Sequence, residues 1–186
     1  MPSLDPAHVD TLLEVAGRAI EQSLHTGRPW LPDPESHAAA LREMRATFVT
    51  LRRAGELRGC VGTLEAVRPL VVDVAHNAWA AAFRDPRFPP LETAERAGLD
   101  IHLSILCPAE PLDFGSEEDL LGQLRPGVDG LILEEGGCRG TFLPAVWEAL
   151  PEPRAFLREL KRKAGLPADH WSDRIRARRY TVESLP

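Results

Sequence analysis

The sequence predicts an α+β fold with a mainly antiparallel or mixed β-sheet, built from hairpins and flanked by helices. Three observations predict it. Strand-like segments come in pairs joined by glycine-containing turns, and helix-like segments with apolar stripes lie between the pairs. No glycine-rich phosphate loop leads from a strand into a helix, which argues against Rossmann and P-loop folds. The 186 residues are enough for a single domain over residues 1–186, with room for a small subdomain.

The first helix is expected from about Pro6 to Leu24. Asp5 and Pro6 supply an N-cap followed by proline at the first helical position, and apolar residues then recur at helical spacing. Three prolines and a glycine over residues 27–34 are typical of a loop. The chain therefore begins with one long amphipathic helix.

A hairpin follows the loop. Residues 47–53 are rich in β-prone side chains, residues 54–56 form the turn, and residues 57–64 return as a second strand. A long apolar helix is then expected from Pro69 to Phe83, where Asp85-Pro86 ends it because a residue before proline avoids helical geometry.

The second half of the chain repeats this mixture of short elements. Four signals predict these elements: period-two alternation for a strand, a serine N-cap for the start of a helix, a Glu-Gly-Gly turn for a hairpin and a glycine C-cap for the end of a helix. The expected elements are a strand over 99–105, a short acidic helix after Ser116, a hairpin of 130–134 with 138–142, helices over 144–150 and 153–164, and a final strand over 175–183.

Charge and composition exclude some function classes. The net charge of −6 opposes nucleic-acid binding, which depends on cationic neutralisation of phosphates. The basic residues over 161–163 and 174–179 lie near acidic ones, as on a solvated face. No apolar run reaches membrane-spanning length, and residues 1–10 lack the pattern of a secretory signal. A cytoplasmic protein without a membrane partner is expected.

The metal-binding residue types are scattered. Cys60, Cys107 and Cys138 have no C-x-x-C spacing, which argues against a disulfide framework and a cysteine zinc site. The six histidines show no paired spacing such as H-x-x-x-H. We therefore expect reduced thiols, no metal and no cofactor.

Cys60 is the first candidate for chemistry. It lies between Gly59 and Gly62 on a predicted strand, and strand glycines mark close backbone approach or a bulge. A thiol beside backbone N–H groups and the positive charge of Arg58 has the surroundings that activate a nucleophile. The alternative is that Cys60 is a small buried apolar residue.

Charged residues at the ends and turns of predicted elements suggest an anion pocket. Arg58, Asp85, Arg87 and Arg139 occupy such places, and arginine binds carboxylate or phosphate bidentately. A small anionic ligand is the partner this predicts. The alternative is that Asp85 and Arg87 form a structural clamp for the loop after the long helix.

A nucleophilic thiol also needs a base within hydrogen-bond reach. His76 on the long helix and His102 on the polar face of a strand are the two candidates. The alternative for each is an ordinary surface histidine.

Five ordered motifs resemble the AMMECR domain family, known in prokaryotes as protein A of the AmmeMemoRadiSam system. The motifs cover residues 55–64, 81–91, 124–131, 139–148 and 163–167. The resemblance supports a pocket built around Arg58, Gly59, Cys60, Gly62 and Thr141. It also implies Memo-type and radical S-adenosylmethionine (SAM) proteins as partners in a shared pathway.

Two functions stay open on this basis. The first is a thiol-dependent enzyme or substrate-handling subunit that acts with those partners. Because the chain has no C-x-x-x-C-x-x-C triplet, any radical chemistry would belong to the partner. The second is a non-catalytic binding or scaffolding module that uses the same glycine-rich surface.

Overall fold

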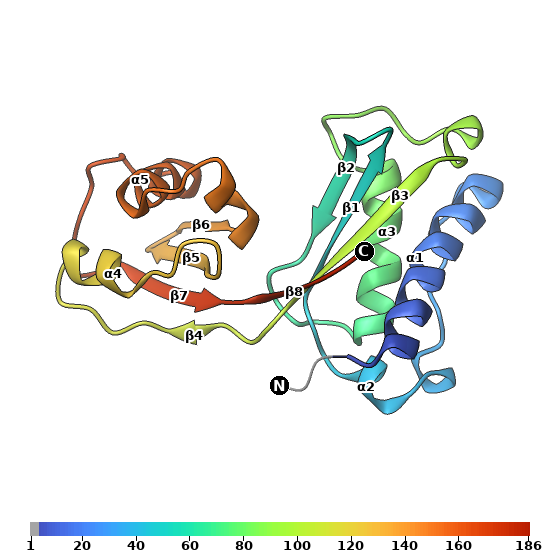
Figure 1. Ribbon diagram of the computed structural model, residues 1–186, viewed down its shortest axis with the longest axis horizontal. Helices are drawn as coiled ribbons and strands as arrows, with labels where there is room; N and C mark the ends of the chain where they lie inside the picture. Colours follow the sequence, from blue (N-terminus) through green and yellow to red (C-terminus); the bar gives the residue numbers. More distant parts are fainter. Residues whose placement is uncertain (1–3) are drawn as a thin grey trace. The chain divides into compact units, whose positions relative to one another are not determined.

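The computed structural model describes residues 4–186, which form two compact units (Figure 1). The first unit contains residues up to 106 together with 183–186, and the second contains residues 107–182. Helices and antiparallel strands alternate in both units, so the predicted α+β class with hairpin-built sheets is confirmed. Residues 1–3, part of the segment inspected for a secretory signal, lie outside the described residues.

The first unit consists of a four-stranded sheet and its helices. The sheet order is β2-β1-β3-β8, which makes β2 an edge strand. Its elements are α1 (Pro6–Thr26), α2 (Ala39–Arg42), β1 (Thr47–Arg53), β2 (Glu56–Gly62), α3 (Leu70–Phe83), β3 (Leu99–Leu106) and β8 (Val182–Leu185).

The ends of α1 follow from its sequence. The Asp5 carboxylate accepts a hydrogen bond from the His8 N–H, and Gly27 ends the helix in the left-handed region at φ 68°. The helix start is as predicted, and its end lies two residues beyond Leu24.

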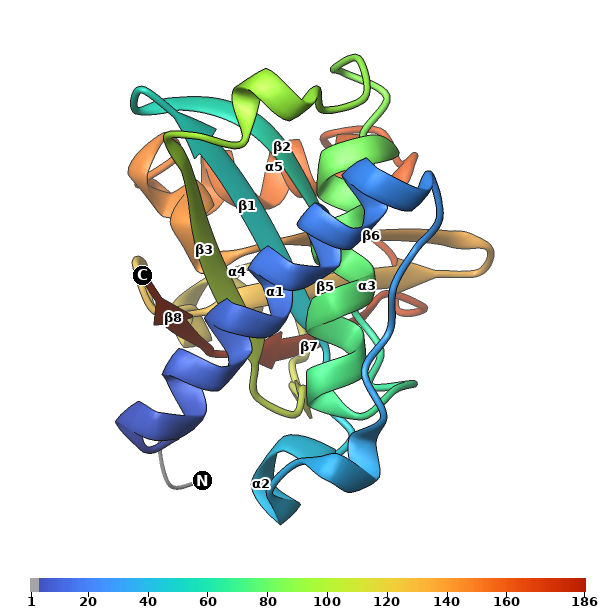
Figure 2. The ribbon, with the colours of Figure 1, turned by 90° about the vertical axis from the view of Figure 1, so that its right-hand side faces the viewer.

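The core of the first unit lies between the sheet and its two long helices (Figure 2). Val49 and Leu51 point from β1 toward the helices, where Val74 and Ala78 of α3 are fully buried. Because side chains alternate along a strand, Thr50 lies on the opposite face of the sheet. Cys60 pairs with Thr50 and therefore lies on that face as well.

The second unit is built around a sheet of order β4-β7-β5-β6. Trp147 and Phe156 stack in its core with ring centroids 3.8 Å apart. Its elements are β4 (Glu110–Pro111), α4 (Glu117–Gln123), β5 (Gly130–Glu135), β6 (Cys138–Phe142), α5 (Pro153–Ala164) and β7 (Arg176–Tyr180).

Two predicted elements are wrong in detail. The final strand expected over 175–183 is two strands, because β7 pairs with β5 in one sheet and β8 belongs to the other. The helix expected over 144–150 is a 3₁₀ helix, Pro144–Glu148. Pro151 follows three residues after Glu148 and disfavours helical geometry at Leu150, so a regular α-helix has no room to form.

Candidate functional site

Arg58 is the extra residue of a β-bulge in the first hairpin. Leu51 of β1 faces Gly59, but the next residue, Arg52, faces Leu57, so Arg58 has no partner across the pair. A bulge re-aims the side chain of its extra residue. The Arg58 guanidinium consequently reaches Glu95, with Nε 2.8 Å from Oε1 and Nη2 2.9 Å from Oε2.

The two glycines beside Cys60 allow close packing. A Cβ on Gly59 would lie 2.2 Å from the backbone oxygen of Ala81 in α3, and one on Gly62 would lie 2.2 Å from the Phe48 ring. Both distances are far below van der Waals contact. The glycines of the motif thus bring β2 against α3 and against the neighbouring strand.

The backbone of Cys60 is held on both of its polar groups. Its N–H donates to Asp85 Oδ2 at 2.9 Å, and its carbonyl accepts from Arg87 Nη2 at 3.3 Å. These groups point to the outer edge of β2, so the Thr50–Cys60 pair is the close, non-hydrogen-bonded kind. The half-buried Cys60 Sγ lies 3.3 Å from Thr50 Oγ1.

Asp85 and Arg87 form the ion pair that holds Cys60. Arg87 Nε is 2.9 Å from Asp85 Oδ1 and Nη2 is 2.7 Å from Oδ2, while the Arg87 N–H also donates to Oδ1. The Arg87 guanidinium holds the pKa of the buried Asp85 carboxyl well below its usual range, helped by the Cys60 N–H. These contacts are those of the structural clamp considered as an alternative.

The Arg58–Glu95 pair lies beside this clamp. Hydrogen bonds from Arg58, then from the Glu92 N–H, lower the pKa of Glu95 to about 2. The Phe88 ring lies under the guanidinium groups of Arg58 and Arg87, 5.8 and 5.6 Å from its centroid. The two motifs of residues 55–64 and 81–91 therefore meet, but each arginine of the predicted anion pocket is already bound to a carboxylate.

The remaining predicted site residues belong to the second unit. Arg139 lies across from Glu134 in the second hairpin, with Nε 2.9 Å from Oε1. The buried Thr141 hydroxyl donates to the Leu131 carbonyl at 2.9 Å and lies 2.9 Å from the Tyr180 hydroxyl. Burial raises the pKa of Tyr180 to about 12. These contacts give Thr141 a role within its own sheet.

The two candidate bases differ in their relation to Cys60. His102 of β3 lies directly opposite Thr50, so Cys60, Thr50 and His102 form one row across three strands on the same face of the sheet. His76 is on α3, which covers the other face, and its Nδ1 lies 3.4 Å from Asn77 Oδ1. The register thus favours His102.

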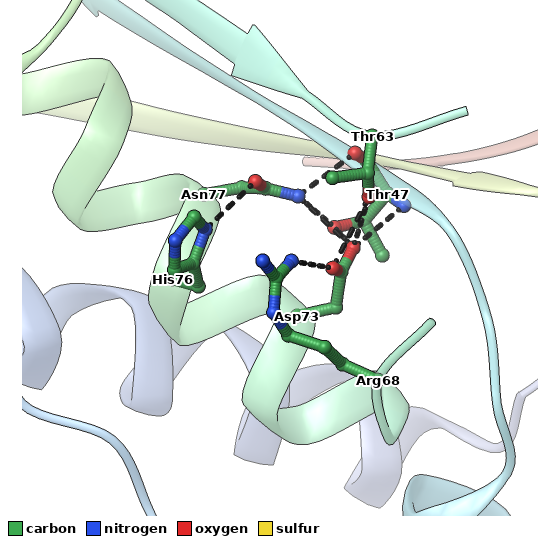
Figure 3. Close-up of polar contacts among 6 residues, drawn as sticks. All are labelled: Thr47, Thr63, Arg68, Asp73, His76 and Asn77. Carbon is green, nitrogen blue, oxygen red and sulfur yellow. Dashed lines mark hydrogen bonds and ion pairs between the residues drawn. The ribbon is translucent and has the colours of Figure 1, made fainter. Parts of the chain in front are cut away.

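A buried polar cluster around Asp73 escaped the sequence reasoning (Figure 3). The Asp73 carboxylate accepts from the Thr47 N–H at 3.0 Å and hydroxyl at 2.8 Å, and from Thr63 Oγ1, Arg68 Nη1 and Asn77 Nδ2 at 2.9 Å. The sequence did contain a signal for this cluster, because Asp73 and Asn77 are polar residues four positions apart on an otherwise apolar helix. The cluster is fully hydrogen-bonded and ties α3 to β1, which makes it structural.

No group of three or more histidine, cysteine, aspartate or glutamate side chains within residues 4–186 is arranged to hold a metal ion. Within the same residues, none of the helices is both long enough and apolar enough to cross a bilayer.

Comparisons with known proteins give consistent matches. A family model described as AMMECR1 matches residues 13–185. A protein from Methanothermobacter thermautotrophicus is 42% identical over 168 residues, covering 88% of this chain and 85% of its own. One from Thermotoga maritima is 37% identical over 168 residues, with 89% and 91% covered. The crystal structure of an uncharacterised Pyrococcus horikoshii protein superposes with a TM-score of 0.84 at 36% identity, covering 93% of this chain and 88% of that one.

Proposed function

Because the chain belongs to the AMMECR1 family, we propose that it is a thiol-dependent enzyme or substrate-handling subunit whose reactive group is Cys60. The observation that carries this proposal is the fixed backbone of Cys60. Asp85 and Arg87 bind its N–H and its carbonyl from a different segment of the chain. A reacting group gains from being held in one geometry by neighbours that are themselves held.

The row across the sheet supplies the proton acceptor in this proposal. Thr50 Oγ1 is within hydrogen-bonding distance of Cys60 Sγ, and His102 is the next side chain along the row. A thiol becomes nucleophilic when a base takes its proton. In this proposal the Thr50 hydroxyl accepts the proton of the Cys60 thiol and passes its own proton to the His102 imidazole. We assign Thr50 as the positioning residue and His102 as the base.

The substrate is supplied or consumed by a Memo-type protein and a radical SAM protein, as the family resemblance implies. The chain has three unpaired cysteines, which suits the reducing cytoplasm.

A specific observation favours the second function, a binding or scaffolding module. The guanidinium groups of Arg58 and Arg87 are each occupied by a carboxylate, so neither brings an unpaired positive charge to the Cys60 thiol. In this reading the glycine-rich strand is a recognition surface and Cys60 is packed against Thr50.

Alkylation by iodoacetamide separates the two functions. The test uses the Cys107→Ser/Cys138→Ser protein, in which Cys60 is the remaining thiol, and the matched variants that keep Cys107 or Cys138 alone. An activated Cys60 reacts faster than both controls below about pH 8, and His102→Gln removes that advantage. Equal rates for the three cysteines would reject the thiol-dependent function.

A further inference from the structure

The first unit contains a second feature, a cavity of about 610 Å³ at the ends of its two long helices. The last turns of α1 and α3 and the segment after α3 come together there (Figure 2). Small-molecule sites typically occupy about 300–1,000 Å³, and the volume of this cavity lies within that range. The apolar lining residues are Leu24, Trp79, Phe83, Pro90 and Leu91, and the others are Ser23, Gly27, Arg84, Glu92 and Thr93.

Arg84 is the one cation among these lining residues. Its guanidinium lies 5.3 Å from the centroid of the Trp79 ring. No carboxylate within residues 4–186 forms an ion pair with Arg84, in contrast to Arg58 and Arg87 nearby. The exposed Arg84 guanidinium can therefore donate two parallel hydrogen bonds to the carboxylate or phosphate group of a ligand.

Two polar residues that line the cavity, Glu92 and Ser23, already form hydrogen bonds within the protein. Glu92 is the one acidic lining residue, and its carboxylate accepts the Glu95 N–H in the capping box of the next 3₁₀ helix. The Ser23 hydroxyl donates to the Ala19 carbonyl, and the Ser23 carbonyl accepts the Gly27 N–H. These acceptors therefore have donors of their own and need none from a ligand.

We propose that this cavity binds a small amphipathic anion. Its carboxylate or phosphate group binds the Arg84 guanidinium, and its apolar body packs against Trp79, Phe83 and Leu91. The lining residues do not include Cys60, so this proposal can be tested independently of the function proposed above.

Titration by NMR tests the proposal with three probes that share a phenyl ring and a short side chain: phenylacetate, phenethyl alcohol and phenethylamine. The expected result is a saturable shift of the Trp79 indole N–H with phenylacetate and weaker binding of the neutral and cationic probes. Arg84→Gln should weaken phenylacetate binding at least about tenfold, because the charge-assisted hydrogen bonds from the guanidinium are lost. Arg84→Lys should retain part of the affinity.

Arg18→Gln is the matched control, because Arg18 lies 4.6 Å from the Trp30 ring outside the cavity. It should leave phenylacetate binding unchanged. Equal affinity for phenylacetate and phenethyl alcohol, an unaltered affinity in a folded Arg84→Gln protein, or shifts at Trp30 in place of Trp79 would overturn the proposal. So would the absence of any saturable shift at Trp79.

Discussion

Cys60 owes its fixed position to an ion pair placed at the edge of a sheet. The outermost strand of a sheet leaves every second N–H and carbonyl without a strand partner. At Cys60 the Asp85 carboxylate and the Arg87 guanidinium take the place of that missing strand. The same pair therefore protects an edge and orders the residue that carries the candidate chemistry.

Asp85→Asn should lower the free energy of unfolding by about 1–3 kcal/mol at pH 7, the range for a lost charged hydrogen bond. The folded pKa of Asp85 is depressed, so its stabilising contribution is present above the ordinary aspartate pKa and is lost as the pH falls. The difference between wild type and Asp85→Asn should shrink from about pH 5 downward. Urea unfolding at a series of pH values measures it.

Asp100→Asn serves as the control for this prediction, because Asp100 is exposed on β3 of the same sheet. It should change stability by no more than about 0.5 kcal/mol at any pH. A stability difference for Asp85→Asn that stays constant down to pH about 3 would contradict the linkage argument.

The sequence pointed to Arg58 and Arg87 and to the partner of Arg87, but not to the partner of Arg58. Asp85 and Arg87 are two residues apart, so their clamp was foreseeable as an alternative. Glu95 lies 37 residues from Arg58, and the contact also depends on the bulge that re-aims Arg58. A local sequence pattern predicts neither a contact between residues far apart in the chain nor a one-residue shift of strand register.

At the scale of elements, local signals predicted most of the first unit. Residues 47–53 form a strand with the expected bounds, and α3 begins one residue after Pro69. The division of the last strand into β7 and β8 was not predictable, because the alternation of apolar residues does not say which sheet each half joins. The partners of a strand are decided by the tertiary fold.

Gly59→Ala tests the close approach of β2 to α3. The added methyl would lie 2.2 Å from the Ala81 carbonyl oxygen, a backbone atom that cannot rotate away. We expect a loss of at least about 2–3 kcal/mol of unfolding free energy, within the range for overpacking in a buried site. Because the helix would be pushed from the strand, the Asp85 contact with Cys60 should loosen as well.

Gly122→Ala is the comparison for this variant, since Gly122 is an exposed glycine in α4 with open space around it. Alanine there should be neutral or stabilise by up to about 1 kcal/mol. Thermal unfolding of both proteins decides the question, and a Gly59→Ala protein as stable as wild type would show that β2 can move away from α3.

At the scale of the whole molecule, the chain builds two separate hydrophobic cores. The buried apolar cluster around Leu103 contains residues of the first unit, and the cluster around Phe156 contains residues of the second. The chain passes between the units twice, after residue 106 and before residue 183. The residues of the Cys60 clamp and of the Arg84 cavity all belong to the first unit.

Core truncations should therefore act locally. Leu103→Ala and Phe156→Leu each remove part of a fully buried side chain, and the costs should be about 2–5 and 1–3 kcal/mol. Amide hydrogen exchange should show Leu103→Ala losing protection in β1, β2 and β3 while β5 and β7 keep theirs, and Phe156→Leu showing the reverse. The alkylation rate of Cys60 should respond to the first variant and not to the second. If either substitution instead lowers protection equally in both sheets, the two cores unfold as one cooperative unit, and the thiol site depends on the second half of the chain as much as on the first.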